Sequence, residues 1–80
     1  MTRHGVVLFF TTSSALRAER VLLNIGLTVQ LIPTPREFSS DCGISCRFRW
    51  ADLERVKQAL DEEAVELSGI QAMEKPDYGA

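Results

Sequence analysis

The chain begins with an unbroken hydrophobic run. Residues 5–10 read Gly-Val-Val-Leu-Phe-Phe, and such a run of β-branched and aromatic residues is typical of a strand at the centre of a sheet. Residues 11–14 supply several N-cap candidates for a helix that we expect to extend to about Ile25. Its apolar stripe repeats at helical spacing and consists of Ala15, Ala18, Leu22 and Ile25, widened by Val21. Gly26 stands where a glycine commonly ends a helix.

Two later segments alternate between apolar and polar residues, as half-buried strands do. Residues 27–32 are the first, and Pro33 ends it. A polar loop over residues 33–43 follows. Residues 44–49 are the second alternating segment, and one face of it carries Ile44, Cys46 and Phe48.

The last third of the chain predicts a second helix and a weaker final strand. Asp52 can cap the helix, whose buried stripe is formed by Leu53, Val56, Ala59 and Leu60. We expect the final strand at residues 65–70. Residues 74–80 contain Pro76 and Gly79 and are expected to form a flexible C-terminal tail.

The resulting order of elements is βαββαβ. Each helix must cross over between parallel strands with a right-handed turn, and the compact solution is a four-stranded antiparallel sheet with both helices on one face. The pattern therefore predicts an α+β fold with the ferredoxin-like arrangement. A chain of 80 residues has room for one domain, which we expect at residues 1–73.

Composition and charge exclude several classes of function. With 45% hydrophobic and 25% charged residues the chain is of ordinary globular type, and no apolar run approaches the ~18 residues of a membrane helix. We find no signal-peptide pattern and expect a cytoplasmic protein with reduced cysteines. A sequence pI of about 5.3 and the lack of a Lys/Arg stripe argue against nucleic-acid binding.

The net charge of −2 hides an uneven distribution. Residues 1–49 hold six arginines and three acids, whereas residues 50–80 hold three cations and eight acids. Both cysteines, Cys42 and Cys46, lie in the basic part, close in sequence to Arg36 and Arg47. A basic environment favours the thiolate form of cysteine.

The expected topology brings Cys42 to the same end of the domain as residues 11–14. Free N–H groups and the positive end of the first helix favour an anion there, which would lower the pKa of the Cys42 thiol. Arg36 and Arg47 add positive potential, and Gly43 allows a close approach of the backbone or a positive φ. Asp41 either forms an Asx turn with Gly43 or orients the thiol.

Cys46 favours a different interpretation, because it shares a strand face with Ile44 and Phe48 and so reads as a core residue. A Cys42–Cys46 disulfide would need a sharp bend, since four residues of strand span roughly 13 Å and a disulfide needs less than about 7 Å between Cα atoms. Two cysteines and the lone His4 do not make a zinc ligand set. We expect neither a metal nor a cofactor.

Residues 33–44 read Pro-Thr-Pro-Arg-Glu-Phe-Ser-Ser-Asp-Cys-Gly-Ile, which resembles the signature of the DUF3343 family of selenium/sulfur (Se/S) carrier-like proteins. The similarity includes a Phe-x-x-Thr-Ser-x-Ala-Leu-x-Ala-Glu string that ends at Glu19 and a Leu-Glu-Arg-Val string that begins at Leu53. It covers roughly residues 5–70.

The resemblance implies a carrier, rather than a stand-alone enzyme, that holds sulfur or selenium on Cys42 as a persulfide or selenosulfide. A donor enzyme such as a cysteine desulfurase would load it, and an acceptor enzyme would unload it. Cys46 is a candidate resolving thiol. The residues expected to support the bound anion are Thr11, Thr12, Ser13, Arg36, Ser39, Ser40, Asp41, Gly43 and Arg47.

Two other functions fit the same pattern. A ferredoxin-like sheet also serves as a non-catalytic interaction or regulatory module, and the fold alone does not distinguish the two. A thiol redox sensor would use both Cys42 and Cys46. An exposed edge strand could also pair with a second copy of the chain to form a homo-oligomer.

Overall fold

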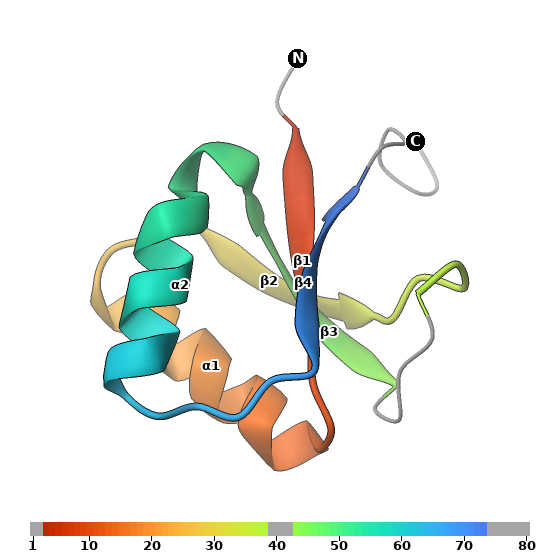
Figure 1. The fold of residues 1–80 in the computed structure, drawn as a ribbon, viewed down its shortest axis with the longest axis horizontal. Helices are drawn as coiled ribbons and strands as arrows, with labels where there is room; N and C mark the ends of the chain where they lie inside the picture. Colours follow the sequence, from red (N-terminus) through yellow and green to blue (C-terminus); the bar gives the residue numbers. More distant parts are fainter. Residues whose placement is uncertain (1–2, 39–42, 74–80) are drawn as a thin grey trace.

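The computed structural model describes residues 3–38 and 43–73 and folds them into one sheet and two helices (Figure 1). The elements in chain order are β1 (His4–Leu8), α1 (Thr12–Asn24), β2 (Val29–Pro33), β3 (Ile44–Arg49), a single 3₁₀ turn (Trp50–Asp52), α2 (Leu53–Glu62) and β4 (Gly69–Met73). The strand order is β2-β3-β1-β4, and every neighbouring pair is antiparallel. Both helices cover the same face. The predicted ferredoxin-like α+β fold is confirmed.

Helix α1 begins and ends where the sequence predicts. The Thr11 side chain accepts a hydrogen bond from the Ser14 N–H at 3.1 Å, so Thr11 is the N-cap. At the other end Gly26 has φ +85°, and its N–H donates to the Leu23 carbonyl while that of Leu27 donates to the Leu22 carbonyl. This pair of bonds is the Schellman motif. Ile25, which the helical stripe placed inside, is 41% exposed because the helix ends at Asn24.

Helix α2 differs from its expected form at both ends. Asp52 occupies the N-cap position, but its side chain makes no capping hydrogen bond, since it closes a 3₁₀ turn that leads into the helix. At the C-terminus Ala64 has a positive φ of 54°. The Ala64 and Val65 N–H groups then donate to Asp61 and Leu60 carbonyls, again as a Schellman motif. The chain is thus still turning at Val65.

This turn explains why the last strand lies later than predicted. The expected strand at residues 65–70 is wrong, because the structure begins β4 at Gly69 and ends it at Met73. Pairing starts with the Ser68 N–H, which donates to the Leu8 carbonyl, and β4 continues along the edge of β1. Residues 74–80 lie outside the described part of the chain, so the boundary at residue 73 stays a prediction.

Each helix donates a hydrogen bond from an arginine to a carbonyl at the C-terminal end of the other helix. The Arg17 guanidinium of α1 donates to the Glu63 carbonyl at 2.7 Å, and the Arg55 guanidinium of α2 donates to the Ile25 carbonyl at 3.2 Å. Each arginine thus satisfies a carbonyl at the negative end of the neighbouring helix.

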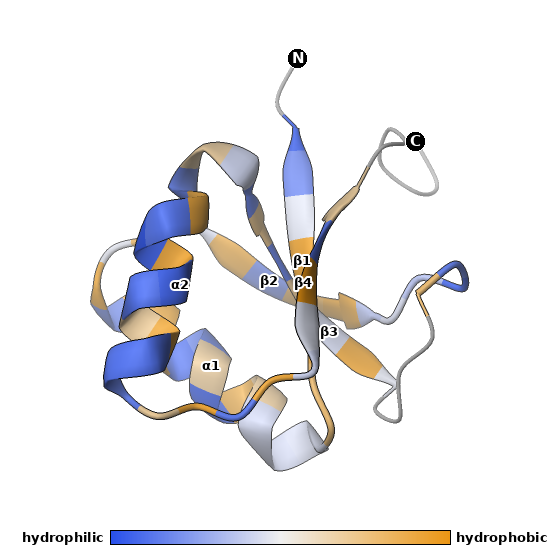
Figure 2. Ribbon diagram, in the orientation of Figure 1, coloured by the Kyte–Doolittle hydropathy of each residue, from blue (hydrophilic) through white to orange (hydrophobic). Residues whose placement is uncertain are grey.

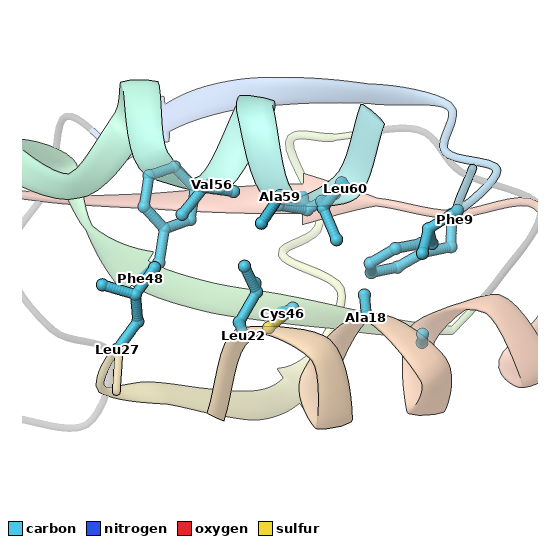
Figure 3. Packing of buried hydrophobic residues seen from close by; sticks show 12 residues of the cluster. Phe9, Ala18, Leu22, Leu27, Cys46, Phe48, Val56, Ala59 and Leu60 are labelled. Carbon is cyan, nitrogen blue, oxygen red and sulfur yellow. The ribbon is translucent and has the colours of Figure 1, made fainter. Parts of the chain in front are cut away.

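Most of the core lies between the helices and the sheet (Figure 3). Hydropathy colouring shows the same division, because α2 turns its hydrophobic residues towards the sheet and its hydrophilic ones outwards (Figure 2). At one end of this layer Trp50 stacks on Phe48, with ring centroids 5.9 Å apart. Gly5 provides the space for it, since a Cβ there would lie 2.6 Å from the Trp50 ring and 2.8 Å from that of Phe48.

A second, smaller cluster lies apart from this core. Val6, Leu8 and Met73 are buried together, with Ile32 and Phe38 packed against them. Val6 and Leu8 alternate with Val7 along β1, so this cluster lies on the sheet face without helices. Burial on both faces of β1 explains the apolar residues from Val6 to Leu8, whereas Phe10 lies beyond the strand and is exposed. Among the described residues, no helix is long and apolar enough to cross a membrane.

Candidate functional site

The described segments next to the predicted thiol site lie at one end of the sheet. In the strand pairing, Leu8 at the end of β1 lies opposite Ser45 near the start of β3. The start of α1 follows β1 directly, and Gly43 precedes β3 directly. Figure 1 shows the beginning of α1 and that of β3 at the same end of the sheet. We call this end of the sheet, formed by residues 11–14 and 43–45, the carrier end. The structure thus places residues 11–14 and Gly43 at one end of the sheet, whereas Cys42, the residue that the sequence predicts there, lies outside the described residues.

The α1 N-terminus at the carrier end is built by a hydroxyl cap. The Thr11 hydroxyl accepts from the Ser14 N–H and donates to the Ser14 Oγ, each at 3.1 Å. Because its oxygen and its hydrogen are both used in this cap, Thr11 orders the helix start instead of providing a hydrogen bond to a ligand. Thr12 and Ser13 are exposed in the first turn, where the helix dipole is positive.

The loop between β2 and β3 is closed where its ends meet. The Thr34 N–H donates to the Gly43 carbonyl at 2.9 Å, and the Thr34 and Ser45 hydroxyls share a hydrogen bond of 2.7 Å. Ser45 is fully buried. A Cβ built at Gly43 would meet no described atom within 4 Å, so packing against the described residues does not require glycine there.

A turn carries the first half of this loop back over the sheet. The Phe38 N–H donates to the Pro35 carbonyl at 3.0 Å, which leaves Arg36 and Glu37 exposed at the tip of the turn. Phe38 then packs against the cluster of Val6, Leu8 and Met73. This contact ties the loop to the helix-free face.

Cys46 lies in the centre of the main core, as its alternation with Ile44 and Phe48 predicts. Its side chain is fully buried, between α1 and the sheet (Figure 3). The pKa of the Cys46 thiol is raised to about 12, mainly by burial and also by the nearby charge of Glu19, while a hydrogen bond with the Gln30 backbone acts in the opposite direction. A thiol with this pKa is protonated near neutral pH and therefore a poor nucleophile. These properties disfavour a resolving role for Cys46.

Arg47 lies away from the carrier end. It is four residues beyond Gly43 on β3, about 13 Å along the strand, and its guanidinium donates to the Gln30 Oε1 at 2.9 Å. The structure therefore does not bring Arg47 to the start of α1, although Arg47 is close to the cysteines in sequence. Arg36 lies in the described part of the loop, with its side chain exposed.

Ser39, Ser40, Asp41 and Cys42 lie outside the described residues, so their expected roles stay predictions. Two described features were not anticipated at all. The first is the Thr34–Ser45 pair, whose only sequence signal is a polar residue at each end of the loop. The second is the packing of Phe38 on the helix-free face, for which an isolated aromatic residue in a polar loop is the signal.

A comparison with protein-family models finds a match to the family described as "Putative Se/S carrier protein-like" over residues 4–71. This range contains every described strand and helix except the last two residues of β4. The chain belongs to this Se/S carrier-like family. The matched range includes both ends of the β2–β3 loop, the start of α1 and both cysteines. No curated protein and no solved structure matches the chain significantly.

Among the described residues, no group of three or more His, Cys, Asp or Glu side chains is placed to hold a metal ion.

Proposed function

We propose that the chain carries sulfur or selenium on Cys42, as a persulfide or a selenosulfide, from a donor enzyme to an acceptor enzyme. The observation that carries this proposal is the family match over residues 4–71. The burial of Cys46 supports the choice of residue, since the chain has two cysteines and one of them is enclosed in the core. Cys42 stands directly before Gly43, whose carbonyl is fixed by Thr34 at the carrier end.

The proposed loading step exchanges one S–S bond for another. The Cys42 thiolate attacks the outer sulfur of a persulfide on the donor, R–S–SH. A bond forms between the Cys42 Sγ and that sulfur, the donor S–S bond breaks, and the donor cysteine leaves as a thiolate. In unloading, a nucleophile of the acceptor attacks the outer sulfur, and Cys42 leaves as a thiolate. Neither step needs a net oxidant or reductant.

Both steps involve anionic sulfur, and the carrier end offers conditions that stabilise an anion. The first turn of α1 lies there with its positive dipole, and it contains no acidic residue. Arg36 supplies a guanidinium in the same loop as Cys42. Both features favour a thiolate or a persulfide anion on a cysteine of this loop.

The core position of Cys46 argues against the redox-sensor alternative. To form a disulfide with Cys42, the Cys46 thiol would have to leave its contacts between α1 and the sheet. No described contact favours a purely regulatory module over a carrier.

The test is loading of the whole chain by a cysteine desulfurase with cysteine, followed by its intact mass without reductant. We expect the mass to increase by one sulfur atom and the increase to disappear on reduction. Cys42→Ser should abolish the gain, and Cys46→Ala, the matched control, should retain it. A gain that persists in Cys42→Ser, or no gain in the wild type with several desulfurases, would contradict the proposal.

A further inference from the structure

A groove lies on the sheet away from the carrier end. Its volume is about 560 Å³, within the range of small-molecule sites. Its lining comes from three strands and the residue before β2, and consists of His4, Thr28, Val29, Gln30, Arg47, Phe48 and Arg49. Since Arg49 is six residues beyond Gly43, the groove lies about 20 Å along β3 from the carrier end.

The strand register places the polar side chains of the groove next to one another. Arg47 and Arg49 are two residues apart on β3 and therefore point to the same face, with Cα atoms about 7 Å apart. His4 lies opposite Arg49 on β1, and Gln30 lies opposite Arg47 on β2. Opposite residues of antiparallel strands have Cβ atoms about 5 Å apart. Two guanidiniums, an imidazole and an amide thus share one small area.

One of the arginines is held in a defined orientation. Gln30 accepts a hydrogen bond of 2.9 Å from the Arg47 guanidinium, and Arg47 is half-buried. An oriented guanidinium loses less side-chain entropy on binding than a mobile one. Arg49 is exposed beside it and can reach into the groove.

The charge of this groove is opposite to that of the chain as a whole. The chain carries a net charge of −2, yet no residue in the described lining is acidic. Apart from the buried Cys46, the charged or titratable residues in the four strands are His4, Arg47 and Arg49. Helix α2, on the other side of the sheet, holds three acids, Glu54, Asp61 and Glu62, against Arg55 and Lys57. The helix-free face of β3 therefore carries two arginines with no acidic residue in the groove lining.

We propose that this groove binds an oxyanion, namely a phosphate or carboxylate group of a small ligand, between Arg47 and Arg49. Guanidinium groups bind both anions through paired, charge-assisted hydrogen bonds. Gln30 and Thr28 provide neutral hydrogen-bonding groups at the rim. The groove is separate from Cys42, so binding there does not depend on the carrier proposal.

The test is an NMR titration of the ¹⁵N-labelled full chain at low ionic strength, with pyrophosphate in one arm and citrate in the other. We expect saturable shifts of the Gln30, Arg47 and Arg49 amides, with a Kd of about 1 mM or tighter. The amides of Thr12 and Ser13 at the carrier end should not follow the same curve. The arm that saturates at the lower concentration identifies the preferred oxyanion.

Two variants that each remove one positive charge distinguish binding in the groove from general electrostatic attraction of the anion to the protein. Arg49→Gln should weaken binding at least about tenfold, the loss expected for one charge-assisted hydrogen bond. Lys57→Gln, on exposed α2, should leave the Kd unchanged. Arg49→Lys should bind with intermediate strength, which also shows that the position tolerates substitution. The proposal is overturned if neither probe saturates, or if Lys57→Gln weakens binding as much as Arg49→Gln.

Discussion

The two sides of strand β3 differ in burial and in the chemistry of their side chains. Its residues Ile44, Cys46 and Phe48 face the helices and pack in the core, whereas Arg47 and Arg49 face the helix-free side. Adjacent residues of one strand therefore have separate tasks. A side chain on the helix side contributes stability and is shielded from reagents. On the other side, Arg47 is half-buried and Arg49 is exposed, so both can contact a ligand.

The cysteines illustrate this difference over only four positions. Cys46 lies within the strand, on its helix side, and burial raises the pKa of its thiol to about 12. Cys42 stands two residues before the strand in the sequence and lies outside the described residues. A sequence motif that contains two cysteines thus corresponds to one structural thiol and one candidate for reaction.

The prediction with the largest expected effect compares the stability of two variants, one on the helix side of β3 and one on its helix-free side. Phe48→Ala should lower the free energy of unfolding by about 3–5 kcal/mol, because it removes a buried ring and the partner on which Trp50 stacks. The neighbouring change Arg49→Ala should alter it by less than about 0.5 kcal/mol, since Arg49 is exposed. Urea unfolding of both variants measures the contrast, and equal losses would contradict it.

A change on the helix side of β1 should have the next largest effect. Gly5→Ala places a methyl group within 3 Å of the Trp50 and Phe48 rings, so we expect a loss of about 1–3 kcal/mol from overpacking. Thermal unfolding measures it. Gly43→Ala is the control at the carrier end, where a Cβ meets no described atom. If Gly5→Ala is as stable as the wild type, the ring packing described above is incorrect.

Alkaline pH should destabilise the fold through Cys46. Below pH 9 the thiol is protonated in both states, since its reference pKa is 9.0 and its folded pKa is about 12. Between these values the unfolded chain releases the proton and the folded chain keeps it, so stability falls by about 1.4 kcal/mol per pH unit. Unfolding at several pH values should show a steeper decline in the wild type than in Cys46→Ala. Identical slopes would mean that the thiol is not shielded.

The prediction with the smallest expected effect concerns a β3 residue that is buried although it faces the helix-free side. Ser45 faces the helix-free side but is fully buried, and its hydroxyl bonds to that of Thr34. Ser45→Ala should cost about 1 kcal/mol, the usual value of one hydrogen bond. Chemical denaturation measures this change. The double variant with Thr34→Val should cost less than the sum of the two single changes, and strict additivity would indicate that the two hydroxyls do not interact.

Much of the fold follows from short-range patterns. The alternation of residues 44–49 predicts the burial of Cys46 and Phe48, and Gly26 predicts the end of α1, because both signals depend only on neighbouring residues. The late start of β4 could not be predicted in this way. Ala64 takes a left-handed conformation that alanine seldom adopts, so no glycine signals the extra turn after α2.

The candidate site was only partly predictable, because it depends on contacts between distant segments. The topology alone places the start of α1 and the start of β3 at one end of the sheet. Proximity in sequence suggested Arg47 as a neighbour of the thiol, but an extended strand carries it about 13 Å beyond Gly43. The packing of Phe38 against Val6, Leu8 and Met73 requires the loop to fold back over the sheet, and local alternation contains no information on that contact.

The most direct test of the division between the two cysteines labels both of them in one sample. The folded wild type is exposed briefly to iodoacetamide near neutral pH, and fragmentation of the peptide that contains both residues assigns the label to each. We predict rapid labelling of Cys42 and none of Cys46 until the chain is unfolded in guanidinium, because the Cys46 thiol is buried and protonated. Labelling of Cys46 in the folded protein at a rate equal to or above that of Cys42 would contradict the account.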